Sequence, residues 1–500
     1  MIAHNAVGRP AVHFNSVQFM FAFLPVVLLA FWAIRRLSVV ASSAWLAAAS
    51  LGFYWLGTYL GLNVNVPLLL GSIAFNFLVG FGIFKLPRWS KAILIFGVSV
   101  DLLILGYFKY AGFILDEIAA PLGASFALDV PRGVNALPIG ISFYTFTQIA
   151  YLVDTYQRKV RDQDPVNYAL FVTWFPHLIS GPILHHKEMM PQFADRTNRR
   201  KLELLAVGIA VFTIGLVKKV FLADPVALHA SPIFAAADAG EAITMASAWV
   251  AALAYTLQLY FDFSGYCDMA VGISFMFGVR LPINFYSPYK ATSIVEFWRR
   301  WHMTLSRFLR DYLYIPLGGN RKGPARRWVN LFITMVLGGL WHGAGWTFLV
   351  WGALHGVYLG INHAFRSFGG RLPAVIAWAL TFLAVVVGWV FFRAQTVDGA
   401  LSLLKAMVGS GMAGTVDWLA VVHIAALMAV VLALPNAYQM LARWQPALLP
   451  RDTEEEIGQG SRLRISLTLP QGMVAGIAVA VSVFMITRQV VPSEFLYFQF

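Results

Sequence analysis

Apolar stretches long enough to cross a membrane recur along almost the whole chain. Of its 500 residues, 59% are hydrophobic and only 12% are charged, about half the charged fraction of an average soluble protein. Because lipid offers the backbone no hydrogen-bond partners, such stretches must be helical. The sequence therefore predicts an all-α, polytopic integral membrane protein, with about twelve transmembrane helices in one membrane-embedded domain, residues 1–500. Runs of roughly 20 apolar residues lie near 17–34, 41–60, 66–84, 92–110, 137–155, 202–222, 245–278, 374–392, 418–436 and 472–490, with two more within 328–365.

The connections between the first spans alternate in charge. Those after the first, third and fifth spans are basic, at 35–36, 85–91 and 158–161, whereas those after the second and fourth are neutral (61–65) or mainly acidic (111–132). Basic loops stay on the cytoplasmic side of a membrane. We therefore expect a multi-pass protein of the cell inner (plasma) membrane, with both termini outside the cytoplasm.

Charge and cysteine content exclude several other classes of protein. The net charge of +13 is attributed to basic loops against the cytoplasmic leaflet, so we expect membrane lipid, and no nucleic acid, as a partner. The single cysteine, Cys267, excludes an internal disulfide framework and a CxxC metal or redox site, and no metal site is predicted. The motifs HEXXH, GxSxG and HxxxxD are absent, as is the Gly-Lys pair of a Walker A loop.

Two segments depart from simple spans. Pro176 and Gly181-Pro182 interrupt "YALFVTWFPHLISGPILHH", which predicts a broken or re-entrant helix in which His177 lines a cavity, with His185 and His186 at the interface. The segment 293–313 predicts one amphipathic helix at the cytoplasmic interface. His302 falls at the boundary between its two faces. The apolar face contains Phe297, Trp298, Trp301, Leu305, Phe308, Leu309 and Tyr312.

The stretch "LGGLWHGAGWTFLVWGALHG", residues 337–356, places His342 in an uncharged region bracketed by glycines. Counted from the basic loop 318–327, His342 lies about 14 residues into its helix, roughly 20 Å deep, and an ionisable residue at that depth marks function by default. The alternative is a neutral imidazole bonded to a carbonyl, with glycines that serve only helix packing. His355, about 220° further around one helix, is not expected to share its site.

Two buried carboxylates leave a further choice open. Asp262 and Asp268 in "YFDFSGYCDMA" either line a polar path or pair with Lys218 and Lys219.

Several stretches resemble the membrane-bound O-acyltransferase family, in particular its bacterial alginate O-acetyltransferase branch, and the pattern is shared by the D-alanyl transfer protein of teichoic acid modification. They follow in order through nearly the whole chain. These stretches are "NSVQFMFAFLPVVLL", "LPIGISFYTFTQIAYLVDTY", "FPHLISGPI", "GLVKKVFLAD", "YFDFSGYCDMAVGI", "EFWRRWHMTLSRFLRDYLYIPLGGNR", "GGLWHGAGWTFLVWGALHG" and the terminal "FLYFQF".

The resemblance implies that His342 is the catalytic histidine and His302 the second signature residue of the family. It also implies a helical body with a tunnel between a cytoplasmic thioester donor and an extracytoplasmic acceptor. No bound cofactor is expected, and acetyl-CoA or another acyl thioester is the expected donor substrate. One departure is Cys267, where the family pattern has serine. The matching stretches supply the substrate-binding candidates His177, Trp341, Asn320, Arg321 and Arg310.

Elementary chemistry fits these roles. A deep, neutral imidazole can take the proton of an acceptor hydroxyl as the hydroxyl attacks a thioester, a contribution of typically 10²- to 10⁴-fold. Arg321 and its basic neighbours suit the phosphates of a donor, although a topology signal explains them equally well. The expected function is acetyl transfer across the membrane for O-acetylation of an exported, alginate-like polysaccharide. We expect it to use an extracytoplasmic partner protein that accepts the acetyl group.

Two alternatives stay open at this point. The first is transfer of D-alanyl or another acyl group to a cell-wall polymer. The second, a secondary transporter or flippase, would use the buried histidines and aspartates as a proton relay, but matched internal repeats are not apparent by eye.

Overall fold

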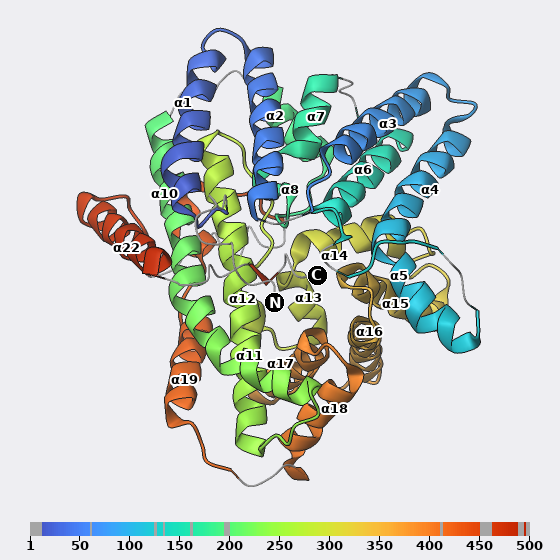
Figure 1. The fold of residues 1–500 in the computed structure, drawn as a ribbon, viewed down its shortest axis with the longest axis vertical. Helices are drawn as coiled ribbons and strands as arrows, with labels where there is room; N and C mark the ends of the chain where they lie inside the picture. The colour runs from blue at the N-terminus through green and yellow to red at the C-terminus, as the bar shows by residue number, and fades with distance from the viewer. Residues whose placement is uncertain are drawn as a thin grey trace.

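The computed structural model describes residues 13–60, 63–124, 128–133, 136–160, 164–194, 201–410, 414–450, 463–488 and 495–496. Within these ranges the chain is helical and contains no β-strand, as predicted. Figure 1 shows α12 near the middle of the molecule, with the short helices α13 and α14 beside it and longer helices around them.

The first half of the chain forms α1 (Leu24–Arg35), α2 (Val39–Leu56), α3 (Val66–Lys85), α4 (Ser90–Lys109), α5 (Ala111–Phe113), α6 (Ile141–Tyr156), α7 (Pro165–Thr173), α8 (Phe175–Leu178), α9 (His186–Ala194), α10 (Lys201–Val217) and α11 (Asp224–Asp238). The second half forms α12 (Met245–Met276), α13 (Ile294–Arg300), α14 (Met303–Leu309), α15 (Gly323–His342), α16 (Trp346–Ser367), α17 (Ala374–Arg393), α18 (Val397–Lys405), α19 (Trp418–Ala433), α20 (Ala437–Met440) and α22 (Leu469–Arg488).

The predicted apolar runs correspond to helices. In the described part of the chain, six helices are long and apolar enough to cross a membrane: α2, α3, α4, the continuous 202–238, α17 and α22. Two shorter apolar helices cover 19–35 and 418–433. One boundary was wrong, because the run predicted to end at 222 continues through a π-helical turn, Lys218–Ala223, into α11. Pro225 has no backbone N–H to donate, and the π-helical turn directly before it lets the helix continue without that hydrogen bond.

The central helix α12 is buried along nearly all of its 32 residues. Glycines let α10 approach it closely. A Cβ added to Gly265 would lie 2.8 Å from the carbonyl oxygen of Gly215, and one added to Gly272 would lie 2.6 Å from the carbonyl oxygen of Gly208. Small residues at such crossings let the helices pack closely. Close packing drives helix association in lipid, where the hydrophobic effect does not bring helices together.

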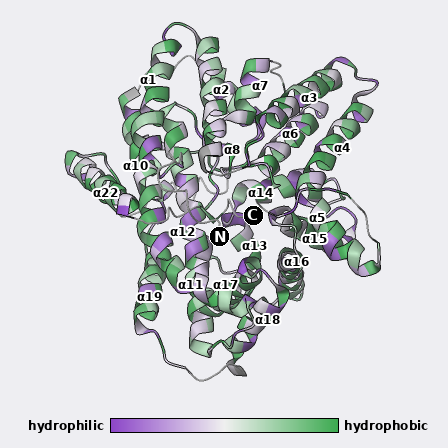
Figure 2. Cartoon of the chain, in the orientation of Figure 1, coloured by the Kyte–Doolittle hydropathy of each residue, from purple (hydrophilic) through white to green (hydrophobic). Residues whose placement is uncertain are grey.

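The outer surface is strongly apolar. Leu29, Leu103 and Val375 expose between 71% and 74% of their surface, as expected of side chains that contact lipid tails. Figure 2 shows hydrophobic residues along the outer helices and more hydrophilic residues toward the centre of the molecule, around α12 and α13. The chain is therefore built as an apolar shell around a more polar middle.

The two irregular segments have different outcomes. The prediction of a broken helix at 168–186 is confirmed: α7 ends at Thr173, α8 has four residues, and residues 179–185 are buried without helical structure. The prediction of one amphipathic helix over 293–313 was wrong. The chain breaks between α13 and α14 at His302 and continues as a π-helical turn, Arg310–Tyr314. Its predicted apolar face is nevertheless buried, from Phe297 at 1% to Trp298 at 9% exposed, except for Tyr312, which is partly buried.

The sidedness of the loops follows from charge and gives a first testable expectation. Single cysteines introduced at exposed Glu117 and exposed Lys322, in a Cys267→Ser background, should differ in labelling by an impermeant maleimide applied to intact cells with a permeable outer envelope. Position 117 should label, and position 322 should label only after the inner membrane is opened, because a basic loop is expected to stay on the cytoplasmic side. Labelling at 322 but not at 117 would invert the topology.

Candidate active site

His302 stands in a strained backbone position at the break between α13 and α14. Its φ of 43° and ψ of 52° lie in the left-handed region, which is uncommon for residues other than glycine. The side chain is fully buried, with 0% exposure, which corrects the prediction that it falls at the boundary between an apolar and a polar helix face. A non-glycine residue in such a conformation is held there by its surroundings and clusters at functional sites.

Asn284 holds this break in place. Its backbone carbonyl accepts a hydrogen bond from Met303 N at 2.9 Å, and its Oδ1 accepts from Thr304 N at 3.2 Å and Thr304 Oγ1 at 2.9 Å. These bonds satisfy amide groups at the start of α14 that have no intrahelical partner. One asparagine therefore caps the helix that begins directly after His302.

The same amide fixes the tautomer of His302. The Thr304 backbone N–H can only donate, so the Asn284 atom it meets is the carbonyl oxygen. His302 Nδ1 lies 3.0 Å from that oxygen and must donate to it. The lone pair of the imidazole is then on Nε2, which is the nitrogen able to accept a proton.

His342 is the last residue of α15, at the opposite end from the basic loop. The next residues, Gly343 and Gly345, are extended and lead directly into α16. A Cβ at Gly339 would clash with the carbonyl oxygen of Phe348, and one at Gly343 with the Phe348 ring. The glycines therefore do serve close packing of α15 on α16, as one interpretation of the sequence held, and this packing also delivers His342 to the turn.

The two candidate catalytic histidines meet at one place, although 40 residues separate them in the sequence. Their ring centroids are 6.2 Å apart with an interplanar angle of 60°. Trp341 contacts both, at 6.2 Å from His302 and 5.0 Å from His342. Trp351 and Phe392 each lie 5.1 Å from His342. The result is a pair of imidazoles enclosed by aromatic walls, with His342 itself 5% exposed.

His177 has a local structural partner. Because the helix breaks at Trp174, the Phe175 amide donates to Ser50 Oγ at 3.2 Å and not to the carbonyl of Phe171. His177 Nε2 donates to that carbonyl at 3.1 Å. Within the described residues no ring contact or hydrogen bond joins His177 to either catalytic candidate. The structure thus explains His177 by the backbone groups that the broken helix frees.

The predicted polar contacts of the basic segment lie elsewhere. Arg310 pairs with its neighbour Asp311 at 2.8 Å with a side chain 62% exposed, and Asn320 and Arg321 are exposed in the loop before α15. None of the three is among the described contacts of His302 and His342. Of the five predicted substrate-binding residues, only Trp341 is brought to the histidine pair.

The remaining histidine and aspartate predictions are resolved by the partners of these residues. The sequence suggested that His355 continues the same helix as His342, but it lies on the next helix, α16. It is fully buried, and its Nδ1 accepts a hydrogen bond from Trp298 Nε1 at 3.2 Å. His185 is buried within the protein, with Nδ1 3.1 Å from Tyr312 Oη. His186 is likewise buried. Asp262 and Asp268 take the pairing alternative, at 2.7 Å from Lys219 and 2.6 Å from Lys218.

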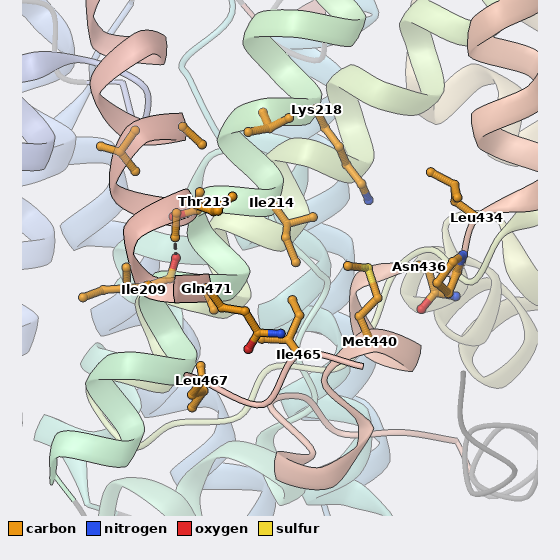
Figure 3. A pocket seen from close by; sticks show the side chains of 18 of the residues that line it. Ile209, Thr213, Ile214, Lys218, Leu434, Asn436, Met440, Ile465, Leu467 and Gln471 are labelled. Carbon is orange, nitrogen blue, oxygen red and sulfur yellow. Dashed lines mark hydrogen bonds between the residues drawn. The ribbon is translucent and has the colours of Figure 1, made fainter. Parts of the chain in front are cut away.

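A cavity of about 910 Å³ lies between α10, α12, α19 and α22. Its lining is mainly apolar and includes neither His302 nor His342. Figure 3 shows Lys218, Asn436 and Gln471 among its side chains. Lys218 is paired with Asp268. Because neither histidine lines the cavity, it is separate from the candidate active site.

Asn284, which orients His302, was not found from the sequence. It follows α12 in an irregular stretch, where an asparagine is ordinary. Its amide nitrogen donates to Cys267 Sγ at 3.3 Å, so the residue that departs from the family pattern contacts the amide that orients His302. A serine hydroxyl would be a stronger acceptor than this sulfur.

Comparison with known proteins now gives the class. The model of the MBOAT, membrane-bound O-acyltransferase family, matches residues 91–394, and the chain belongs to this family. It is 43% identical over 433 residues to the peptidoglycan O-acetyltransferase of Helicobacter pylori, covering 79% of this chain and 80% of that protein. It is 44% identical over 408 residues to the probable alginate O-acetylase AlgI of Pseudomonas aeruginosa, covering 80% and 75%.

A more distant relative is the teichoic acid D-alanyltransferase of Bacillus subtilis, 26% identical over 280 residues, with 51% of this chain and 69% of that protein covered. The chain is a multi-pass membrane O-acyltransferase of the alginate O-acetylase and peptidoglycan O-acetyltransferase type. Family membership decides for an enzyme over the transporter alternative.

Proposed function

We propose that this chain transfers an acetyl group from a cytoplasmic acyl thioester, such as acetyl-CoA, to a hydroxyl acceptor outside the inner membrane. The observation that carries the proposal is the meeting of His302 and His342, 6.2 Å apart, inside an aromatic enclosure. An imidazole pair excluded from water suits proton transfer to and from an oxygen nucleophile. The more similar relatives are an O-acetyltransferase and an O-acetylase, which supports acetyl over D-alanyl.

The chemical step balances without an added cofactor. The acceptor hydroxyl oxygen attacks the thioester carbonyl carbon while His342 takes the hydroxyl proton. A C–O bond forms, the C–S bond breaks, and the thiolate leaves with the proton that His342 returns. His302 Nδ1 donates to Asn284, so its Nε2 acts as a proton acceptor beside the same centre, and His302 can share the proton transfer with His342. Trp341 forms the wall against which the acyl group lies.

The acceptor reached first is a small hydroxyl group on an extracytoplasmic partner protein, which then modifies an exported polysaccharide. Two of the described connections between helices are short: 239–244 joins α11 to α12, and 343–345 joins α15 to α16. Neither is long enough to form a carbohydrate-binding domain. A hydrated polymer would also leave hydroxyl groups unpaired inside an apolar body, at about 1 to 3 kcal/mol each.

The relay is tested by reconstitution. The purified chain in proteoliposomes receives labelled acetyl-CoA at its cytoplasmic face, with alginate or peptidoglycan fragments outside. Without a second protein, neither polymer should gain label; with a soluble extracytoplasmic extract of the source cells, one of them should. The polymer that gains label identifies the acceptor class. Efficient acetylation of either polymer by the chain alone would refute the relay and leave the histidine chemistry untouched.

A further inference from the structure

Lys109, the last residue of α4, points its ammonium group at the end of the helix that carries His342. Its Nζ donates hydrogen bonds to the backbone carbonyl oxygen of Trp341 and, at 3.3 Å, to that of His342. It also lies 3.4 Å from Ser142 Oγ on α6 and 5.8 Å from the centroid of the Trp341 ring. One side chain therefore joins three elements at the candidate active site.

The next residue continues the contact. Tyr110 Oη donates to the carbonyl oxygen of Leu340 at 3.1 Å, so α4 and the residue after it satisfy three successive carbonyls at the end of α15. The last four carbonyls of a helix have no partner within that helix, and in a membrane no water replaces them. A positive charge at this end also interacts favourably with the helix dipole.

We propose that Lys109 is a positioning residue for His342, holding the final turn of α15, together with Tyr110, so that the imidazole faces His302. The proposal rests on the proposed role of His342. Helix ends fray unless other groups hold them in place. Gly343, directly after His342, has no side chain to restrict the backbone there. A misplacement of about 1 Å in a catalytic group can lower a rate by about 100-fold, so a clamp on this turn has a direct effect on the reaction.

The ordinary role of a lysine at the end of an apolar span is to reach out to the membrane surface. Lys85 shows that role: it is the last residue of α3, is exposed, and has its Nζ 5.5 Å over the ring of Phe81. Lys109 occupies the same position in α4 and turns inward. Lys85 is therefore a matched control, because it shares the residue type and the helix position without the contact to α15.

The kinetic test compares Lys109→Met, Lys109→Arg and Tyr110→Phe with Lys85→Met. Lys109→Met should lower kcat by between about 10- and 100-fold, with the KM for the thioester changed less than about two-fold, since the group orients the base and does not bind the donor. Lys109→Arg should recover part of the loss, because it keeps a cation that donates to carbonyls. Lys85→Met should match the wild type. Equal kcat in Lys109→Met and Lys85→Met would overturn the proposal.

A second measurement does not depend on catalysis. In a Cys267→Ser, His342→Cys background, the rate at which a small thiol-reactive reagent labels position 342 is measured with and without Lys109→Met. Loss of the clamp should raise this rate several-fold, whereas an unchanged rate contradicts positioning. Tyr110→Phe, which removes the hydrogen bond to the Leu340 carbonyl and keeps the ring, replaces Lys109→Met in this measurement if Lys109→Met does not fold. Wild-type activity in His342→Ala would contradict the proposed function but not the proposed role of Lys109. The labelling result would still decide whether Lys109 holds this turn.

Discussion

Replacing His342 with alanine is expected to lower acyl transfer by about 10²- to 10⁴-fold while the protein remains folded in the membrane. The reason is that His342, together with His302, is one of the two imidazoles of this enclosure, and the ordinary pKa of an imidazole suits it to take and return a proton near neutral pH. The remaining walls, Trp341, Trp351 and Phe392, offer aromatic surface and cannot act as a base. The O-acetyl content of the exported polymer, in cells that carry only the variant, measures the effect.

A suitable control is His423→Ala. His423 is a half-buried histidine on α19 whose Nδ1 lies 3.2 Å from His229 Nε2, away from the candidate site. It should retain normal acetylation at a matched amount of protein in the membrane. Normal acetylation in His342→Ala would remove this residue from the mechanism.

Replacing His302 should lower activity at least about ten-fold, and three variants separate the imidazole from its backbone. Glycine and asparagine both tolerate the left-handed conformation that His302 adopts at φ 43°, whereas alanine does not. If the imidazole matters, His302→Gly, His302→Asn and His302→Ala should all lose activity, and the first two should keep near-normal thermal stability. Activity of detergent-purified protein and its thermal unfolding midpoint are the two measurements.

The opposite result is equally specific. If His302→Gly and His302→Asn stay active while His302→Ala is inactive and unstable, His302 serves only to turn the chain between α13 and α14. The contact with His342 would then have no part in catalysis.

The spans were predictable because membrane helices are specified locally. Lipid forces every apolar run of sufficient length to bond its own backbone, so α3 and α4 are visible in the sequence without knowledge of their neighbours. The broken segment was visible for the same reason, since Pro176 and Gly181-Pro182 cannot continue a helix. The helix end predicted at 222 was wrong, because a π-helical turn, Lys218–Ala223, carries the helix past Pro225 to Asp238.

The site itself could be predicted only in part. His342 stood out because an ionisable side chain is costly within an uncharged membrane run and is usually kept there for function. The break at His302 could not be seen in the sequence, because the helical periodicity is continuous through 293–313. The break is caused by tertiary contacts, the hydrogen bonds that Asn284 accepts from Met303 and Thr304. Contact between His302 and His342 depends on how α14 and α15 pack, which no spacing in the sequence encodes.

Lys109 and Asn284 were missed for a related reason. A lysine at the end of an apolar span reads as a topology signal, and an asparagine in a loop reads as a turn residue. Both interpretations describe the usual environment of the residue type. Only the structure shows that Lys109 reaches the carbonyls of Trp341 and His342, and that Asn284 is fully buried against His302.

The proposed mechanism depends above all on His342 acting on a donor that arrives from the cytoplasmic face. The most direct measurement is a single turnover in proteoliposomes, with labelled acetyl-CoA supplied to the cytoplasmic face and the extracytoplasmic extract on the other side. Wild-type protein should move label to the extract and release one equivalent of free thiol with it, while His342→Ala, reconstituted in equal amount, should do neither. Equal transfer by the two proteins, or transfer only when the donor is on the extracytoplasmic side, would contradict this mechanism.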